Sequence, residues 1–263
     1  MNPIQLFLAR AALLGLVLLA WAWLPTHGYI NPALLPPLGE VLDTLWQLLQ
    51  RSQVHQAIGV SSAEVLVAFV IAVPLGTLLG ALIAEHAYFG AIFKPFLFYV
   101  FSIPKSIFLP MFILVFGISF TQKVAYATFT TTFVVLMSAA ACVESIKQEY
   151  VLVARSYGAT RLQLLRRVYL PSMLPLLLET IRIAMIFNFT AVLIAEMYAS
   201  RTGMGHLISG WGENFQMRQL FAGIVLLSLI AIVFNESVRF LETRCALVEQ
   251  TSHRPHRRDR PLR

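Results

Sequence analysis

The amino-acid sequence predicts an all-α integral membrane protein with about six transmembrane helices and one long loop between the fourth and the fifth. The first observation behind this prediction is composition: of 263 residues, 58% are hydrophobic and 13% are charged, and the mean hydropathy is +0.73. Soluble domains have roughly 45–50% apolar and about 25% charged residues. A soluble fold of this length could not bury so much apolar surface, so lipid must be its solvent.

The second observation is a series of charge-poor runs, each long enough to cross about 30 Å of hydrocarbon as a helix. A helix is the only open-ended element that satisfies its own backbone hydrogen bonds in lipid. The predicted spans cover approximately residues 6–24, 58–84, 92–118, 124–143, 176–199 and 219–240. We expect a single transmembrane domain over residues 1–245, which includes a loop at 144–175, followed by a basic, disordered tail at 246–263.

The first run has two interpretations. Arg10, the apolar stretch Ala11–Leu24 and its small residues are consistent with a cleavable signal peptide. We prefer an uncleaved first helix, because Trp21 and Trp23 suit the aromatic belt at a membrane interface and the later runs are also membrane-like. After this span, apolar residues at helical spacing in Glu40–Gln50 predict a short amphipathic helix at the interface.

The distribution of basic residues predicts the orientation of the spans. With an even number of spans, both termini lie on one side of the membrane. That side holds fourteen Lys and Arg residues, five of them in the tail, whereas the other side holds four: Arg51, Lys123, Arg201 and Arg218. This excess predicts that both termini and the long loop lie in the cytoplasm.

The sequence offers none of the usual chemistry of an enzyme. It contains no Gly-Lys dipeptide and therefore no phosphate-binding P-loop. The six histidines have no metal-ligand spacing on a shared helix face, and the two cysteines, Cys142 and Cys245, form no disulfide pattern. A membrane-embedded enzyme would need paired carboxylates or His-rich spacing within the spans, which the sequence lacks. Nucleic-acid binding is a poor alternative for a basic tail that is tied to a membrane.

The loop between the fourth and fifth spans is too long and too regularly patterned to be a simple connection. Apolar residues in Val151–Ala154 and again in Leu162–Val168 predict two short amphipathic helices. Gly158 separates them, and Thr160 is placed to cap the second. Pro171 marks the return to the membrane. A basic surface near anionic lipid would explain the arginines of the loop but not the spacing of its Gly and Leu-Pro.

This loop resembles the cytoplasmic loop of permeases in binding-protein-dependent ATP-binding-cassette importers. The family pattern reads Glu-Ala-Ala, three residues, Gly, nine residues, Ile or Val, one residue and Leu-Pro. The residues that stand at this spacing are Gly158, Val168, Leu170 and Pro171. The first two positions depart from the pattern, since Leu152 and Val153 replace Glu and Ala, so no role of that carboxylate carries over. The resemblance implies an ATPase-coupling role for Ala154, Arg155, Gly158, Ala159, Arg161, Val168, Leu170 and Pro171.

Further segments are similar to the nitrate, sulfonate and taurine branch of this family. They are Ile103-Pro104-Lys105, Leu109-Pro110, Phe116-Gly117-Ile118, Ala195-Glu196-Met197 and Gly203-Met204-Gly205. The branch implies import of a small anion such as a sulfonate, taurine, nitrate or bicarbonate, with a pyrimidine or another vitamin precursor as the alternative. An ion-coupled secondary transporter is the rival from another class, but the sequence shows no inverted repeat of the kind that is usual there.

The resemblance also implies partners. The chain would pair with a second copy of itself, bind two cytoplasmic ATPase subunits and receive solute from an extracytoplasmic binding protein, all at a bacterial-type inner membrane. ATP and Mg would be used by the ATPase, and this chain would bind no cofactor. The first short helix would dock in a groove of the ATPase, with small Ala154 and Gly158 allowing close approach. Glycine at 158 would either take a positive φ or let two backbones come close.

Some residues within the spans are candidates for the translocation pathway. They are Pro104, Lys105, Pro110 and Glu196. The ammonium of Lys105 is costly to bury in lipid and needs a partner or water. It would either attract an anionic substrate or form a structural ion pair with Glu196 or Glu64. The two prolines would break two helical hydrogen bonds and open backbone carbonyls toward a cavity.

Overall fold

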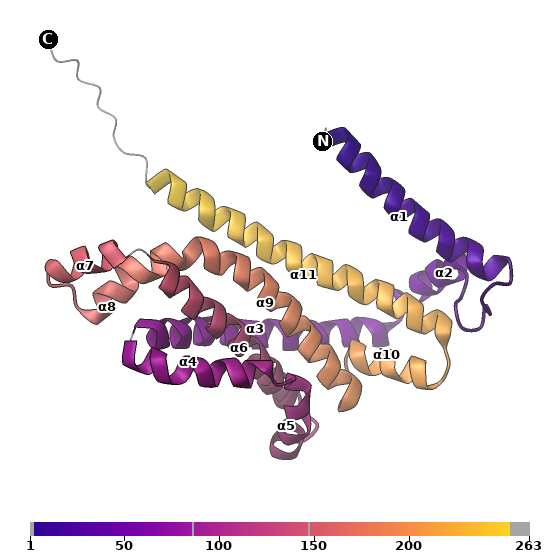
Figure 1. Cartoon of the computed structure of the whole chain (residues 1–263). Helices are drawn as coiled ribbons and strands as arrows, with labels where there is room; N and C mark the ends of the chain where they lie inside the picture. The colour runs from indigo at the N-terminus through magenta and orange to yellow at the C-terminus, as the bar shows by residue number, and fades with distance from the viewer. Residues whose placement is uncertain (1–2, 86, 147, 253–263) are drawn as a thin grey trace, which may run out of the picture. The chain divides into compact units, whose positions relative to one another are not determined.

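The structure, a computed structural model, describes residues 3–85, 87–146 and 148–252. The regular elements in these ranges are all helices (Figure 1). They are α1 (Pro3–Thr26), α2 (Leu38–Leu48), α3 (Ser52–Glu85), α4 (Ala87–Ser102), η1 (Lys105–Phe108), α5 (Leu109–Phe116), α6 (Phe120–Ser145), α7 (Gln148–Ser156), α8 (Arg161–Leu164), η2 (Leu165–Tyr169), α9 (Leu170–Tyr198), α10 (Met204–Glu213) and α11 (Met217–Ser252).

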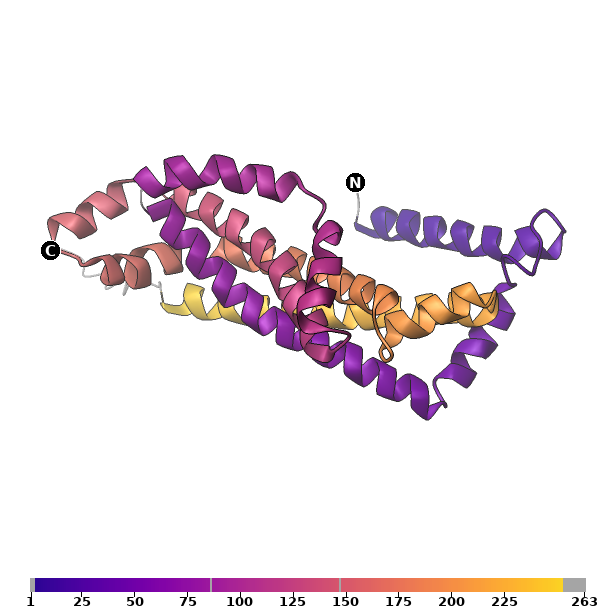
Figure 2. The same cartoon turned by 90° about the horizontal axis from the view of Figure 1, so that it is seen from below.

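In the described part of the chain, five helices are long and apolar enough to cross a membrane. They cover Gln5–Thr26, Ser52–Glu85, Phe120–Ser145, Leu176–Tyr198 and Met217–Phe240, in agreement with five of the predicted spans. The remaining span is a bent pair, Gly90–Ser102 and Lys105–Phe116, whose halves meet at 86° (Figure 2). The all-α membrane fold is therefore confirmed, and its third span is broken rather than straight.

The chain groups into two compact units. Unit 1 comprises Met1–Glu64, Ile118–Phe120 and Val192–Ile230, and unit 2 comprises Val65–Gly117, Thr121–Ala191 and Ala231–Arg263. The long helices α3, α9 and α11 contribute residues to both units. The single transmembrane domain expected over residues 1–245 stays a prediction.

Helix α6 lies at the centre of unit 2, and 61% of its spanning segment is buried. Helix α3 approaches it closely because Gly76 and Gly80 carry no side chain. A Cβ at Gly76 would lie 2.7 Å from the Cβ of Val135, and a Cβ at Gly80 would collide with the carbonyl oxygen of Leu136. This Gly-xxx-Gly pair is typical of tight helix contacts in membranes.

Asn188 on α9 joins three helices of unit 2 by hydrogen bonds. Its Nδ2 donates to the carbonyl oxygen of Val65 on α3 at 2.8 Å, and its Oδ1 accepts from Oγ1 of Thr131 on α6 at 3.1 Å. The side chains of Asn188 and Thr131 are fully buried. Such interhelical bonds contribute about 0.6 kcal/mol each in membranes, so close packing supplies most of the stability of this unit.

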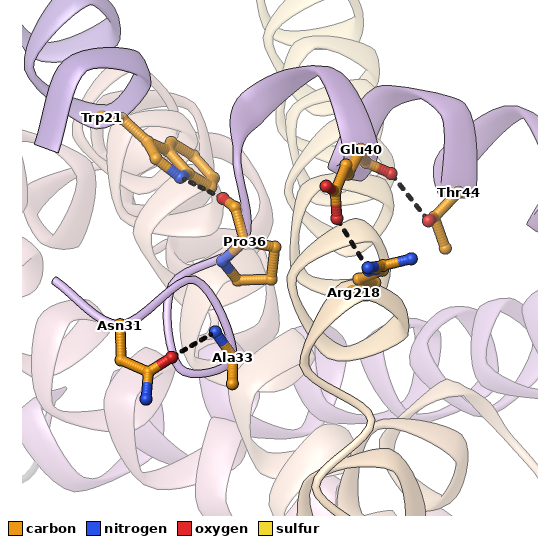
Figure 3. A network of polar contacts seen from close by, with 7 residues as sticks. All are labelled: Trp21, Asn31, Ala33, Pro36, Glu40, Thr44 and Arg218. Atoms are coloured by element: carbon orange, nitrogen blue, oxygen red, sulfur yellow. Dashed lines mark hydrogen bonds and ion pairs between the residues drawn. The ribbon is translucent and has the colours of Figure 1, made fainter. Parts of the chain in front are cut away.

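Polar contacts hold the end of α1 and the start of α2 in unit 1 (Figure 3). Nε1 of Trp21 donates to the carbonyl oxygen of Pro36 at 3.1 Å, and the Trp21 ring lies 5.7 Å from that of Phe221. Nε of Arg218 pairs with Oε2 of Glu40 at 2.7 Å. The most apolar window of the α1 span has no buried residue within the described chain. The contacts of Trp21 therefore hold the C-terminal part of α1, and its retention as an uncleaved helix stays a prediction.

Two shorter segments differ in how well the sequence predicts them. The short amphipathic helix expected over residues 40–50 is present as α2, which buries Val41 and Leu48. Helix α11 continues to Ser252, past the start of the tail expected at residue 246, and the disordered tail stays a prediction. The rest of the predicted tail lies outside the described residues.

Candidate functional site

The loop between α6 and α9 contains two short helices, α7 and α8, joined by a turn at Gly158 (Figure 1). The amide of Ala159 donates to the carbonyl oxygen of Ala154 at 3.1 Å, and the amide of Gly158 donates to that of Arg155 at 2.9 Å. These two bonds form the Schellman motif that ends many helices. Gly158 has a φ of +75°, in the left-handed region that costs other residues about 1–2 kcal/mol.

The space around Gly158 bears on the two expected reasons for glycine at this position. A Cβ built there has no heavy atom within 4 Å. Among the described residues, no second backbone therefore approaches it. The positive φ of the turn is by itself a sufficient reason for glycine, and close approach of a partner's backbone stays a prediction.

Thr160 caps the second short helix, as its place in the sequence predicts. The amide of Thr160 donates to Oε1 of Gln163 at 2.8 Å, and the amide of Gln163 donates to Oγ1 of Thr160 at 3.4 Å. This reciprocal pair is a capping box. Together with the Schellman motif it fixes the path of the chain from α7 into α8.

A cluster of apolar side chains fastens the two short helices to the ends of the membrane helices. Its buried members are Ala81, Ala139, Cys142, Val143, Leu164, Tyr169, Met173 and Leu177, and Val151, Ala154 and Ala159 pack against it. Ala154 packs against this cluster and stays partly exposed. Its small side chain suits the packing of α7 against α6 and α9, and the expectation that it gives an ATPase close access stays a prediction.

A second face of α7, continued by Tyr157 just after the end of the helix, is apolar and exposed. Tyr150, Val153 and Tyr157 stand at helical spacing and are 56%, 57% and 89% exposed. Arg155 lies on the other side of the helix, toward Tyr169. Apolar side chains gathered on an exposed face are typical of a protein interface. We call these three residues the docking face.

Tyr169 lies where the loop meets the membrane helices. Burial raises the pKa of its phenol, and the Glu85 carboxylate raises the pKa further, whereas the Arg155 guanidinium and its hydrogen bond lower it. The phenol is therefore neutral at physiological pH. Arg155, one of the predicted coupling residues, thus links α7 to the start of α9 through Tyr169.

The other predicted loop residues lie along the return to the membrane. Val168 belongs to η2, a π-helical turn, and Leu170 and Pro171 begin α9. Pro171 has no amide hydrogen and its ring crowds the carbonyl oxygen of the preceding turn, and the wider turn of η2 accommodates both defects. Arg161 is the first residue of α8, and its side chain lies outside the described part of the chain.

The third span is interrupted at Pro104. Helix α4 ends at Ser102, Pro104 precedes the short 3₁₀ helix η1, and α5 follows. Pro110 lies in the first turn of α5, where a helix needs no amide donor. The expectation that Pro110 breaks a second hydrogen bond is therefore wrong. The bend of 86° is explained by the break at Pro104.

Lys105 fills this break. Its Nζ donates to the carbonyl oxygens of Val100, Phe101 and Ile103 at 3.1, 2.6 and 2.9 Å. It also lies 4.8 Å from the ring centroid of Phe101 and 5.8 Å from that of Phe133. The ammonium thus caps the C-terminal end of α4, where the helix dipole favours a cation. The opened carbonyls meet Lys105 rather than a cavity, and its described partners include no carboxylate.

Lys105→Met should lower the free energy of unfolding by about 1–3 kcal/mol, because three carbonyl oxygens lose their donor. Thermal unfolding of the protein in nanodiscs measures the change. Lys105→Arg keeps the charge and the donors, so it should recover most of the stability. Unchanged unfolding of Lys105→Met, together with reduced uptake, would contradict the capping role and favour contact with the substrate.

Glu196 holds the turn between α9 and α10 in unit 1. It is fully buried, and its Oε1 accepts from Oγ of Ser61 at 2.6 Å while its Oε2 accepts from the amide of Gly205 at 2.7 Å. Oγ of Ser61 also accepts from the amide of Met204 at 2.8 Å. The carboxylate therefore lies at the N-terminus of α10, where the helix dipole favours a negative charge. This position favours a structural role of Glu196 over one in the pathway.

Sequence reasoning does not find two parts of these sites. Ser61 is missed because a single serine in a long apolar helix carries no pattern. The docking face is missed although the spacing of Tyr150, Val153 and Tyr157 is visible in the sequence. The signal in the sequence that indicates the docking face is the presence of two apolar faces on one short helix.

The sequence matches a known family and known proteins. The family described as "Binding-protein-dependent transport system inner membrane component" matches residues 72–246. The taurine transport system permease protein of Escherichia coli (strain K12) is 28% identical over 236 residues, which are 88% of this chain and 86% of that protein. The formylaminopyrimidine transport permease protein of Halalkalibacterium halodurans is 28% identical over 213 residues, 81% of this chain and 84% of that protein.

The fold also matches a solved structure. A chain in the crystal structure of a bacterial ABC transporter involved in the import of the acidic polysaccharide alginate aligns with a TM-score of 0.64. The match covers 90% of this chain and 96% of that chain at 15% sequence identity. At this identity the likeness shows a shared fold alone.

Proposed function

The chain belongs to the family of binding-protein-dependent transport system inner membrane components, and we propose that it couples solute import to ATP hydrolysis through the docking face of α7. As a member of this family, it is the membrane-spanning permease subunit of an ATP-driven importer. Beyond family membership, we propose a contact of this subunit with the ATPase, its orientation in the membrane, the assembly that it forms and the solute that it carries.

The observation that carries the proposal is the two-sided construction of α7. Tyr150, Val153 and Tyr157, the last just after the end of the helix, are exposed to the outside, whereas Val151 and Ala154 pack against the ends of α6 and α9. A partner that moves α7 therefore also moves the ends of membrane helices. An ATPase subunit is the partner that fits, because the chain has no P-loop of its own.

Val153→Asp tests this contact. It should lower both co-purification of the ATPase and binding-protein-stimulated ATP hydrolysis about tenfold or more, because the new charge must lose its water at the interface. Leu34→Asp is the matched control, since Leu34 is also 57% exposed but lies in the loop between α1 and α2. It should change neither quantity. If the two variants had equal effects, or if neither had an effect, the result would contradict docking of the ATPase on α7.

The proposed orientation places the docking face and both termini in the cytoplasm, at the bacterial inner membrane. It is supported by the excess of Lys and Arg on that side. Single cysteines at the exposed positions Leu162 and Leu34 test it. A membrane-impermeant maleimide should label Leu34→Cys in intact cells and Leu162→Cys only after permeabilisation. Labelling of Leu162→Cys in intact cells would overturn the orientation.

The proposed assembly contains two copies of this chain, two ATPase subunits and an extracytoplasmic binding protein. A second copy and lipid cover the apolar surface of α1 that the described chain leaves exposed. ATP and Mg are bound by the ATPase subunits. The binding protein docks on the outer side, where α10 buries Met204 and Ile208 and leaves its other face accessible.

The proposed solute is a small anion such as a sulfonate, which the similarity to the taurine permease supports. A vitamin precursor is the second candidate, because the formylaminopyrimidine permease is equally identical over a shorter match. Proteoliposomes that hold the complex and its binding protein should take up labelled taurine. Uptake of a labelled pyrimidine instead would establish the second candidate.

A further inference from the structure

Lys105 is committed to carbonyl oxygens, so a cation that meets an anionic solute must come from another part of the chain. Unit 1 contains a cavity of about 640 Å³ between the N-terminal part of α3 and the turn that leads from α9 into α10. Its polar lining includes Gln53, Gln56, Arg201 and His206. We propose that this cavity is a subsite for a small oxoanion, such as a sulfonate, and that Arg201 binds the charge.

Arg201 differs in its bonding from Arg218 and Lys105. Within the described residues its exposed guanidinium makes no hydrogen bond and no ion pair. In contrast, Arg218 pairs with Glu40, and Lys105 is bonded to its own segment. A guanidinium offers five N–H donors in one plane, and two of them match two oxygens of a sulfonate, a carboxylate or a nitrate.

The other polar groups of the cavity supply hydrogen bonds without a negative charge. Gln53 and Gln56 are three residues apart on one face of α3, and His206 lies in the first turn of α10. Their amide and imidazole N–H groups can donate to the oxygens that Arg201 leaves free. Like Arg201, these side chains have no hydrogen-bond partner among the described residues.

The Glu196 carboxylate lies close to the cavity, and its surroundings determine how much negative charge it contributes there. Glu196 lies next to Gly203 in the cavity wall, since a Cβ on Gly203 would be 2.9 Å from its Oε2. The carboxylate is fully buried, and it accepts from Ser61 and Gly205 inside the fold. The N-terminus of α10 offsets part of its charge. The charged group that reaches the cavity itself is therefore Arg201.

The size of the cavity indicates a weak, charge-selective site. A volume of about 640 Å³ is within the range of roughly 300–1,000 Å³ that is usual for ligand pockets. A sulfonate with two or three carbon atoms fills only a part of it and leaves room for water. Such a site attracts anions as a class, and the selection of one solute remains with the binding protein.

This subsite deepens the proposed function and rests on it for the direction of transport, so its test must not depend on transport. Gly59→Cys places a thiol in the cavity wall, where a Cβ has no neighbouring heavy atom within 4 Å. The full chain in nanodiscs is treated with two methanethiosulfonate reagents, one with a sulfonate group and one with a trimethylammonium group. The chain without the added cysteine gives the background.

Each modification rate is divided by the rate of the same reagent with a free thiol in solution. The ratio of the two normalised rates reports the sign of the electrostatic potential in the cavity. The sulfonate reagent should react faster, and Arg201→Gln should lower the ratio about tenfold, because it removes one unit charge at close range. Arg218→Gln is the matched control, since Arg218 is paired with Glu40 and does not line this cavity. It should change the ratio by less than about twofold because salt screens distant charges.

Protection measures binding of an anion directly. Ethanesulfonate should slow the modification of Gly59→Cys by the neutral reagent N-ethylmaleimide, choline should not, and Arg201→Gln should abolish the protection. Equal rates for both charged reagents, or equal protection by both ions, would overturn the proposal. Protection by the unliganded binding protein alone would also overturn it and assign the cavity to a protein contact. None of these outcomes alters the ATPase contact, which Val153→Asp tests separately.

Discussion

Gly158→Val is expected to abolish the coupling between binding protein and ATPase while the permease keeps its normal level in the membrane. Valine at a φ of +75° is strained by about 1–3 kcal/mol, so the Schellman turn opens and α7 leaves its position on the loop. The membrane helices satisfy their own hydrogen bonds in lipid and should be unaffected. Binding-protein-stimulated ATP hydrolysis in the reconstituted complex should fall to the basal rate.

Two further variants make this result specific. Gly158→Asn introduces a residue that tolerates the left-handed region and should keep most of the stimulation. Gly28→Val imposes the same kind of strain at a φ of +77°, in the loop after α1, and should leave the stimulation unchanged. Normal stimulation in Gly158→Val, or an equal loss in Gly28→Val, would show that this turn is not the coupling element.

Gly203→Ala should strongly reduce the amount of folded protein. Gly203 has a φ of +100°, and a Cβ there would collide with Oε1 of Glu196. The carboxylate cannot move away without losing its bonds to Ser61 and Gly205, so strain and lost hydrogen bonds together should cost about 3–5 kcal/mol. The melting temperature and the membrane level of the variant measure this cost.

A double-mutant cycle attributes the cost to this one contact. Glu196→Ala alone should also destabilise the protein, because α10 loses the carboxylate at its N-terminus. In that background Gly203→Ala should cost less than in the wild type by about 1–3 kcal/mol, since the methyl group no longer meets an oxygen. Additive costs of the two substitutions would contradict the contact between Gly203 and Glu196.

The membrane helices could be predicted from the sequence because a charge-poor run of sufficient length has one stable form in lipid. The break in the third span could also be predicted, since Pro104 marks it. Its angle and the role of Lys105 could not. In the sequence Lys105 is a costly charge in a membrane segment, and only the structure shows the three carbonyl oxygens that the break presents to it.

The loop between α6 and α9 also has features that could be predicted from the sequence and features that could not. The roles of Gly158 and Thr160 follow from local signatures, a helix stop and a capping box, which depend on residues close in sequence. The packing of Ala154 against the cluster could not be predicted, because a small side chain suits both docking and packing. The role of Glu196 could not be predicted either, because its hydrogen-bond partner Ser61 is 135 residues away along the chain. Local chemistry was therefore predictable, and contacts between distant segments were not.

The central claim is that the docking face of α7 contacts the ATPase. Site-specific cross-linking in the reconstituted complex tests it most directly, with Tyr157→p-benzoylphenylalanine on the docking face and Leu34→p-benzoylphenylalanine as the control. Both positions are exposed, so the probe disturbs neither core. Irradiation should join the probe at 157 to the ATPase subunit, identified by mass spectrometry, and the probe at 34 should not capture it. No ATPase cross-link from position 157, or one of equal yield from position 34, would contradict the claim.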